Sequence, residues 1–234
     1  METILIMSGK GGVGKTTVAV NLATLLADKG YKVGLMDADI HGPNVPEMLG
    51  MSGSQVTQKD KKILPVKVNP NFEMISIAFF TERSKSVIWR GPMKHNLLRQ
   101  FIEDVSWNDN DYLIVDLPPG TGDESISIIQ LIQSKGAIIV STPQKVSIAD
   151  SVRSIDFCRS MEVPIIGLVE NMSGSIFGKG TIEAVAKENE IPFLGTIPLD
   201  ESIVKDSESG KPFIKEESYA KEVLDSIAKK IGEK

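Results

Sequence analysis

The sequence predicts an α/β fold: a doubly wound, mostly parallel β-sheet with helices on both faces. Three features of the chain support this prediction. Apolar runs of strand length recur along the sequence, segments with helical periodicity lie between them, and a glycine-rich loop joins the first run to the first helix. Strands that alternate with helices are joined by right-handed crossovers, and neighbouring strands are then parallel.

Several apolar runs have the length and composition of strands that are buried on both faces. These runs are Ile4–Met7, Val33–Met36, Tyr112–Val115, Ala137–Val140 and Ile165–Val169. The first helix is indicated by apolar residues at helical spacing from Val18 to Leu26. It is expected to end at Gly30, because glycine is common just after a helix C-terminus.

Two other segments need a separate interpretation. Residues 50–70 contain glycine, serine, the segment Lys59-Asp60-Lys61-Lys62 and two prolines, which predicts an exposed excursion or a short hairpin and no domain boundary. The polar face of the last helix mixes acids with bases, so we expect this helix to pack against the domain in preference to a membrane surface. Its apolar face consists of Val223, Leu224, Ile227 and Ile231.

Composition limits the possible functions. The chain has 234 residues, 41% of them hydrophobic, which is enough for one globular domain spanning residues 1–234. Its net charge is 26 − 31 = −5, without a basic run, so binding to nucleic acid is disfavoured. The single cysteine cannot form an intrachain disulfide, and no apolar run approaches the roughly 18 residues needed to span a bilayer. We therefore expect a cytoplasmic protein without stable membrane insertion.

A phosphate-binding loop follows the first apolar run. Residues 9–16 fit the pattern G-x-x-x-x-G-K-[ST] between a strand and a helix. Glycines let backbone N–H groups turn toward phosphate oxygens, and the helix N-terminus adds the positive end of its dipole. Lys15 is expected to neutralise the β- and γ-phosphates, and the Thr16 hydroxyl to bind Mg²⁺. The predicted nucleotide-binding residues of this loop are Gly9, Lys10, Gly11, Gly12, Val13, Gly14, Lys15, Thr16 and Thr17.

Carboxylates follow two other predicted strands. Asp116 ends the run at 112–115, at the sheet edge where open α/β sheets bind ligands, and is a candidate second-shell or water-mediated magnesium ligand. Asp37 and Asp39 follow the second run. His41 has no His or Cys cluster around it in the sequence, so a structural hydrogen bond is favoured over a metal role.

The two lysines of the loop, Lys10 and Lys15, carry a resemblance. The segment Lys-Gly-Gly-Val-Gly-Lys-Thr resembles the deviant Walker A motif of the ATPases that include nitrogenase iron protein, the septum-positioning and chromosome-partitioning ATPases, and the Mrp-type iron-sulfur carriers. The resemblance implies a P-loop NTPase that works as a homodimer, in which Lys10 contacts the nucleotide of the opposing subunit. It also implies that Asp39 orients the attacking water while Asp37 lies nearer the magnesium, so that Lys10, Lys15 and Asp39 form the catalytic set. The implied metal-site residues are Thr16, Asp37, Asp39 and Asp116.

The nucleotide base is expected to be adenine. The guanine signature Asn/Thr-Lys-x-Asp follows none of the candidate strands. In the ATPases of this group, an asparagine at one strand end and a Pro-Leu-Asp turn at another contact adenine. By resemblance, these positions are Asn171, Pro198 and Asp200 in this sequence, which favours ATP.

Further segments narrow the resemblance to the Mrp-type iron-sulfur cluster carrier ATPases, over nearly the whole chain. These segments are Asp37–Pro43, Trp89–Met93, Asp116–Asp123, Ser141–Gln144 and Val169–Ser173. One departure from the family matters. Its usual Cys-x-x-Cys pair, which supplies the cluster ligands, is absent, because Ser173-Gly174-Ser175 runs directly into Ile176-Phe177-Gly178. Cys158 is expected to be a buried small hydrophobe.

Two functions remain open at this point. The first is a dimeric MgATPase of the iron-sulfur cluster carrier or assembly type, with assembly or recipient proteins as partners and with cluster ligation by this chain in doubt. The second is an ATP-driven dimerisation switch of the septum-positioning or partitioning type, which binds a partner protein or a membrane surface without a cluster.

Overall fold

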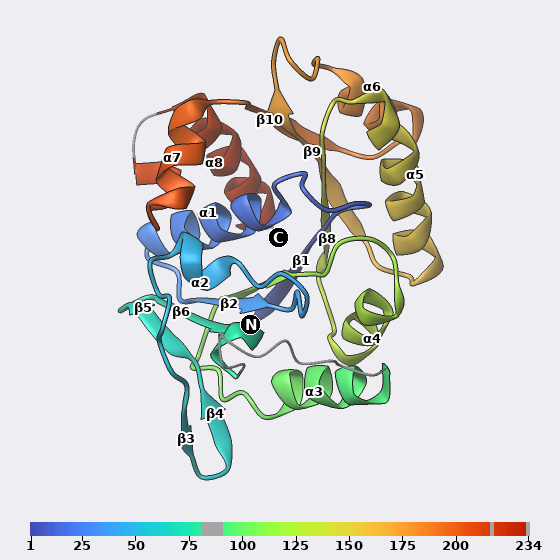
Figure 1. Ribbon diagram of the computed structural model, residues 1–234. Helices are drawn as coiled ribbons and strands as arrows, with labels where there is room; N and C mark the ends of the chain where they lie inside the picture. The colour runs from blue at the N-terminus through green and yellow to red at the C-terminus, as the bar shows by residue number, and fades with distance from the viewer. Residues whose placement is uncertain (81–90, 216–217, 233–234) are drawn as a thin grey trace.

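The computed structural model describes residues 1–80, 91–215 and 218–232, and its central element is an eight-stranded sheet (Figure 1). The strand order is β10-β9-β8-β1-β7-β2-β6-β5. All neighbouring pairs are parallel except β5 and β6 at one edge. The strands of this sheet are β1 (Glu2–Met7), β2 (Val33–Asp37), β5 (Val66–Asn69), β6 (Phe72–Ser76), β7 (Tyr112–Asp116), β8 (Gly136–Ser141), β9 (Ile165–Ser173) and β10 (Phe193–Pro198).

Helices connect the parallel strands, as the alternation of patterns predicts. They are α1 (Lys15–Asp28), α2 (Val45–Met48), α3 (Gly91–Glu103), α4 (Asp123–Leu131), α5 (Lys145–Ser160), α6 (Thr181–Glu188), α7 (Glu201–Glu208) and α8 (Tyr219–Gly232). Two 3₁₀ turns, η1 (Ile77–Phe79) and η2 (Phe213–Lys215), complete the set. As expected, α1 is followed by a glycine in the left-handed region, Gly30 with φ 92°.

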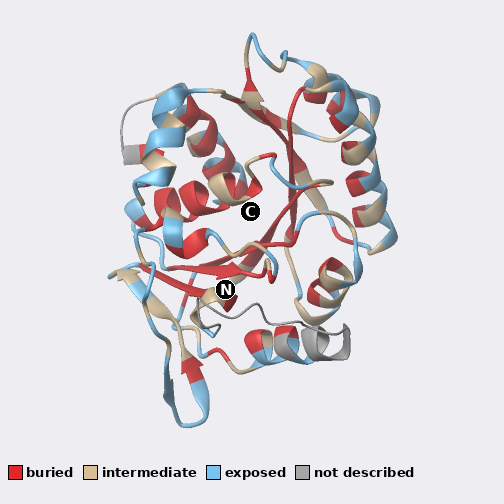
Figure 2. Ribbon diagram, viewed as in Figure 1, coloured by how far each residue is buried: buried red, intermediate tan, exposed pale blue. Residues whose placement is uncertain are grey.

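The sheet is buried on both faces, which confirms the doubly wound arrangement (Figures 1 and 2). Successive residues of a strand point to opposite faces. On β1, Ile4 and Ile6 join a core with α1 and α8, whereas Leu5 and Met7 join a second core with α3, α4, α5 and α6. Burial on both sides explains why the predicted strands are continuous apolar runs without alternation.

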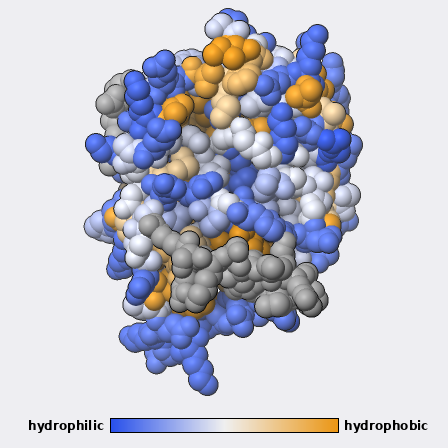
Figure 3. All heavy atoms as spheres, viewed as in Figure 1, coloured by the Kyte–Doolittle hydropathy of each residue, from blue (hydrophilic) through white to orange (hydrophobic). Residues whose placement is uncertain are grey.

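The region 50–70 contains the predicted hairpin and one element that was not predicted. Strands β3 (Thr57–Lys59) and β4 (Lys62–Leu64) form a hairpin that projects from the body and is hydrophilic (Figures 1 and 3). The amide of Ile63 donates to the carbonyl of Asp104 (2.8 Å), which ties the hairpin to the end of α3. The chain then returns as β5 and adds an antiparallel strand to β6, so this region is not entirely an excursion.

The last helix packs against the domain, as expected. Its four predicted apolar residues are buried in the core that α8 shares with α1. Cys158 is also fully buried, in the other core. No helix among the described residues has both the length and the apolar character needed to cross a membrane. Trp89 and Arg90, two residues of the family-specific segments, lie outside the described residues.

Candidate functional site

The loop between β1 and α1 has the backbone that the phosphate pattern requires. Gly12 and Gly14 lie in the left-handed region, with φ 77° and 79°, a backbone conformation that is strained for residues other than glycine. A Cβ at Gly14 would also collide with the Asn171 side chain. The side-chain amide of Asn171 donates a hydrogen bond to the backbone carbonyl oxygen of Val13 (2.8 Å), so the end of β9 holds this loop in place.

Lys15 and Asp116 form a buried ion pair at the centre of the site. Lys15 Nζ lies 2.6 Å from Asp116 Oδ1, and the two side chains are 7% and 1% exposed. The Thr16 hydroxyl donates to the other oxygen of Asp116 (2.7 Å). Burial raises the pKa of Asp116, and the Lys15 ammonium and the Thr16 hydroxyl oppose that rise. This geometry brings the loop lysine, the loop hydroxyl and the predicted partner carboxylate into one cluster.

Asp37 and Asp39 leave the end of β2 in different environments. Asp37 is fully buried and accepts hydrogen bonds from the Ser76 hydroxyl (2.8 Å) and the amides of Asp39 and Val45. Burial, together with the charge of Asp116, raises its pKa to about 7. Asp39 is half-buried, and its Oδ1 accepts hydrogen bonds from the backbone amides of His41 (3.0 Å) and Gly42 (3.1 Å). Asp39 is therefore the more accessible of the two carboxylates.

Loops from neighbouring strands flank the phosphate loop. Lys10 Nζ lies 3.4 Å from Gln144 Oε1, in the loop after β8. On the other side, the amide of Gly120, in the loop after β7, donates to the carbonyl of Ser8 (2.8 Å). His41 Nε2 lies 3.1 Å from Glu124 Oε1, which is the kind of structural hydrogen bond expected for it. Within the described part of the chain, no cluster of three or more His, Cys, Asp or Glu side chains is arranged as a metal site.

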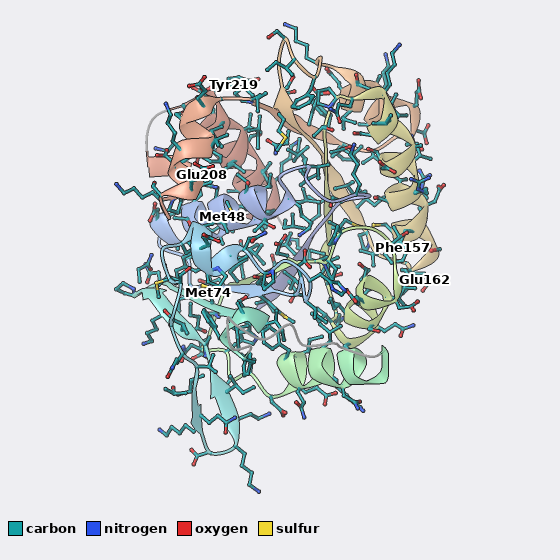
Figure 4. The ribbon with its side chains drawn as sticks, viewed as in Figure 1. Met48, Met74, Phe157, Glu162, Glu208 and Tyr219 are labelled. Carbon is teal, nitrogen blue, oxygen red and sulfur yellow. The ribbon has the colours of Figure 1, made fainter. Side chains whose placement is uncertain are left out.

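The three residues expected at the base lie around one cavity of about 200 Å³. Asn171 and Pro198 come from the ends of β9 and β10, and Glu208 lies on the α7 side of the cavity (Figure 4). The Asp200 carboxylate caps α7 by accepting the Ser202 amide (2.7 Å) and hydroxyl, and these hydrogen bonds lower its pKa. Thr17, in the first turn of α1, lines the same cavity, so the predicted phosphate and base residues adjoin.

The segment where the family has its cysteine pair is a tight turn. Gly174 and Gly178 exchange two backbone hydrogen bonds (2.9 and 2.8 Å) across it. The carboxylate of Glu170 accepts hydrogen bonds from the backbone amides of Gly180 (2.9 Å) and Ile182 (3.0 Å), which hold the start of α6 in place. The only cysteine of the sequence, Cys158, is buried on α5 with its Sγ 3.2 Å from a methionine sulfur. The thiol content of this chain therefore does not fit an iron-sulfur cluster.

Sequence reasoning did not assign a role to several residues that hold the site in place. Gln144 and Glu170 stand in segments that carry the family resemblance, but neither residue type by itself indicates a hydrogen-bond partner. Glu124 lies just after the glycines of the loop that follows β7, and its contact with His41 joins residues 83 positions apart. Ser76 gave no signal, because the strand that it ends was not predicted and its contact with Asp37 joins residues 39 positions apart.

The parallel sheet, the left-handed glycines and the buried Lys15 define the class of this protein as a P-loop NTPase fold. Residues 1–232 match the ParA family model described as NUBPL iron-transfer P-loop NTPase, and the chain belongs to that family.

Individual relatives agree with this assignment. The chain is 46% identical over 243 residues to an iron-sulfur cluster carrier protein of Methanocaldococcus jannaschii, covering 99% of this chain and 84% of that protein. It is 44% identical over 247 residues to a cytosolic Fe-S cluster assembly factor NUBP2 homolog of Nematostella vectensis, covering 98% and 92%. A solved nucleotide-binding protein from Archaeoglobus fulgidus in complex with ADP is 34% identical, with a TM-score of 0.80 over 92% of this chain and 89% of that one.

Proposed function

We propose that this chain binds MgATP and hydrolyses it slowly to ADP and phosphate, as a homodimer that serves iron-sulfur cluster assembly. The observation that carries the proposal is the buried ion pair of Lys15 and Asp116 at the glycine loop, to which the half-buried Thr16 donates a hydrogen bond. A buried ammonium is costly unless it is paired. In this chain its partner is Asp116, and phosphate oxygens would give it a second set of negative partners.

Each residue of the cluster has a proposed part. Lys15 binds the β- and γ-phosphates, and the loop amides bind phosphate oxygens. Thr16, backed by Asp116, would hold Mg²⁺, which supplies charge neutralisation between the phosphates. Asp37 lies nearer this cation, while Asp39 is placed by two backbone amides to orient the attacking water.

The remaining parts concern the base and the second subunit. Asn171, Pro198 and Asp200 surround the adenine, in the cavity next to Thr17. Lys10 reaches the nucleotide of the opposing subunit, leaving its weak 3.4 Å contact with Gln144.

Cluster ligation is assigned to other proteins. The buried thiol of Cys158 has no second cysteine to act with, so this chain contributes the nucleotide-driven step and its assembly or recipient partners contribute the thiolates. The name of the Nematostella vectensis relative supports a cytosolic place in iron-sulfur assembly, and that of the Methanocaldococcus jannaschii relative supports a role in carrying the cluster. A purely membrane-binding switch is less well supported, because the apolar face of α8 is buried in the core.

A pair of variants tests the ATPase proposal. Asp39→Ala should bind a fluorescent MgADP analogue with nearly the affinity of the unsubstituted protein but lose at least about 100-fold in the rate of ATP hydrolysis, since water positioning is lost. Lys15→Ala should lose binding itself. Phosphate release and analogue fluorescence measure the two quantities, and circular dichroism checks folding. Unchanged hydrolysis in Asp39→Ala would show that the assigned role is wrong.

Anaerobic reconstitution tests the assignment of the thiolates. The purified chain is incubated with iron, sulfide and a thiol reductant, and its iron and acid-labile sulfide are measured after desalting. We expect neither to remain bound. Stoichiometric iron and sulfide on the homogeneous chain would contradict the proposal.

A further inference from the structure

The hairpin of β3 and β4 projects from the lower end of the molecule, away from β10 and α6 (Figure 1). Every residue from 57 to 62 is exposed. Residues 57–64 carry three lysines and one aspartate, a local charge of 3 − 1 = +2 in a chain whose net charge is −5. The hairpin is therefore a basic projection on an acidic protein, and it forms a hydrophilic extension of the surface (Figure 3).

The base of the hairpin is fixed to the segment that follows α3. Ile63 of β4 is 8% exposed and belongs to the core that contains Phe101 of α3. The amide of Ile63 donates a hydrogen bond to the carbonyl oxygen of Asp104, and its carbonyl oxygen accepts one from the amide of Ser106 (both 2.8 Å). Because the base is fixed, the tip is presented in one place and loses little conformational freedom when it docks against another molecule.

The tip has a lysine where the backbone favours glycine. Lys59 pairs with Lys62, so Asp60 and Lys61 form a two-residue loop between the strands. Both loop residues have positive φ, 52° and 65°. A two-residue loop with positive φ at both positions is a type I′ turn, in which Asp-Gly and Asn-Gly are the preferred pairs. Asp60 fits this preference, but Lys61 adopts a left-handed backbone that costs free energy.

The strands contain a second choice that opposes stability. Lys59 and Lys62 lie directly opposite each other in an antiparallel pair, where like charges destabilise. Lys62 is partly compensated, because its Nζ donates to the carbonyl oxygen of Glu103 (2.8 Å) and lies 3.8 Å from Asp104 Oδ1. Lys59 and Lys61 form no ion pair with any residue that the structure describes. Residues that conflict with the local structure in this way are expected at functional sites.

The distribution of charge favours a protein with an acidic surface over nucleic acid as the partner. Binding to nucleic acid depends on many phosphate contacts, and the chain outside the hairpin has a net charge of −5 − 2 = −7, which repels a long polyanion. A small acidic patch on a folded protein needs only the few cations that a hairpin tip presents.

We propose that the β3–β4 hairpin is a docking site for the acidic surface of a partner protein, with Lys59 and Lys61 as its contact residues. The inference goes beyond the proposed ATPase, because the hairpin is attached to the segment after α3 and lines no part of the base cavity. The ammonium groups of the two lysines supply the attraction, and the fixed base supplies the orientation.

A fluorescein-labelled peptide of alternating glutamate and serine is the probe. It is titrated with the full chain at about 50 mM NaCl, fluorescence anisotropy reports binding, and about 0.5 M NaCl should abolish the signal. Lys59→Glu/Lys61→Glu should raise the dissociation constant at least about tenfold. Lys187→Glu/Lys229→Glu is the matched control, because it reverses two exposed lysines on α6 and α8 and changes the net charge equally; it should change the constant by no more than about twofold.

Lys61→Gly separates binding from stability. Glycine adopts the left-handed backbone without strain, so the thermal midpoint should rise, while the loss of one ammonium group should raise the peptide dissociation constant at least about threefold. A lysine that serves only the hairpin's own structure would give no change in peptide affinity. Circular dichroism checks the folding of every variant.

Three results would overturn the proposal. The first is equal binding, or no binding, of the peptide by the unsubstituted protein and Lys59→Glu/Lys61→Glu. The second is tighter binding of a DNA duplex of about 20 base pairs than of the peptide, which would make nucleic acid the partner. The third is self-association that depends on the two lysines in sedimentation velocity, which would make a second copy the occupant. Because none of these measurements uses nucleotide, their failure leaves the proposed ATPase untouched, and unchanged ATP hydrolysis in Asp39→Ala would leave the docking site untouched.

Discussion

The ion pair between Lys15 and Asp116 makes a strong prediction about stability in the absence of nucleotide. Lys15→Met keeps most of the apolar stem of the side chain but leaves the Asp116 carboxylate 1% exposed, with the Thr16 hydroxyl as its remaining side-chain donor. Breaking a buried ion pair by removing one partner costs about 3–5 kcal/mol. We expect a loss of that order in the free energy of unfolding at pH 8.

The loss should depend on pH in a defined direction. Burial already raises the pKa of Asp116, and removing Lys15 removes the main opposing charge. A carboxyl group whose pKa is higher in the folded than in the unfolded state takes up a proton on folding. The free energy of unfolding therefore falls as the pH rises from the unfolded-state pKa through the folded-state pKa. The penalty of Lys15→Met should therefore be largest at pH 8 and shrink toward pH 5.

Urea unfolding followed by circular dichroism, without nucleotide and at several pH values, measures these free energies. Adding Asp116→Asn to Lys15→Met should recover most of the loss at pH 8, because an amide does not carry the uncompensated charge. Lys10→Met is the matched control: Lys10 belongs to the same loop but makes only a 3.4 Å contact, so the change should stay within about 0.5 kcal/mol. If Lys15→Met is as stable as the unsubstituted protein at pH 8, or if the double variant is no more stable than Lys15→Met, the reasoning is refuted.

Three further predictions concern Glu170 and Asn171, near the C-terminal end of β9, and the buried thiol of Cys158. Asn171→Ala leaves the carbonyl of Val13 without its donor and should cost about 1–3 kcal/mol in unfolding free energy, together with weaker MgADP binding; equal affinity by titration calorimetry would argue against a base site there. Glu170→Ala removes both side-chain acceptors at the start of α6 and should lower the urea midpoint by more than the exposed control Glu188→Ala does. Burial raises the pKa of the Cys158 thiol to about 12, so a thiol reagent at pH 8 should label the protein only after unfolding, and rapid labelling of the native chain would contradict the burial.

The parallel strands were predictable because each is buried on both faces. A strand such as β7 must then be apolar at every position until it reaches the sheet edge, where Asp116 marks its end. The last strand at one edge of the sheet and its neighbour, β5 and β6, were harder to predict. β5 is only partly buried and has no apolar run. β6 contains the buried Glu73, whose carboxylate accepts hydrogen bonds from the side-chain amides of Asn108 and Asn110 in a distant loop.

The chemistry of the site was predictable in part, for a similar reason. The phosphate loop needs residue types with special backbone freedom at fixed spacing, so Gly12, Gly14 and Lys15 are recognisable in the chain itself. The partners of these residues have no fixed spacing. Asn171 reaches Val13 from 158 residues away, and only its likeness to a family drew attention to it.

The sequence by itself determined five parallel strands and the first helix, the phosphate loop with its two lysines, and the absence of a cysteine pair, because each of these is a property of neighbouring residues. Tertiary structure decided which polar groups meet. It paired Lys15 with Asp116 across 101 residues, buried Asp37 while leaving Asp39 accessible, and fixed the base of the β3–β4 hairpin to the segment after α3. The physical reason is that burial and pairing depend on which strand ends lie next to each other in the sheet. The crossovers between parallel strands set these neighbours, and strands that are neighbours in the sheet can be far apart in the sequence.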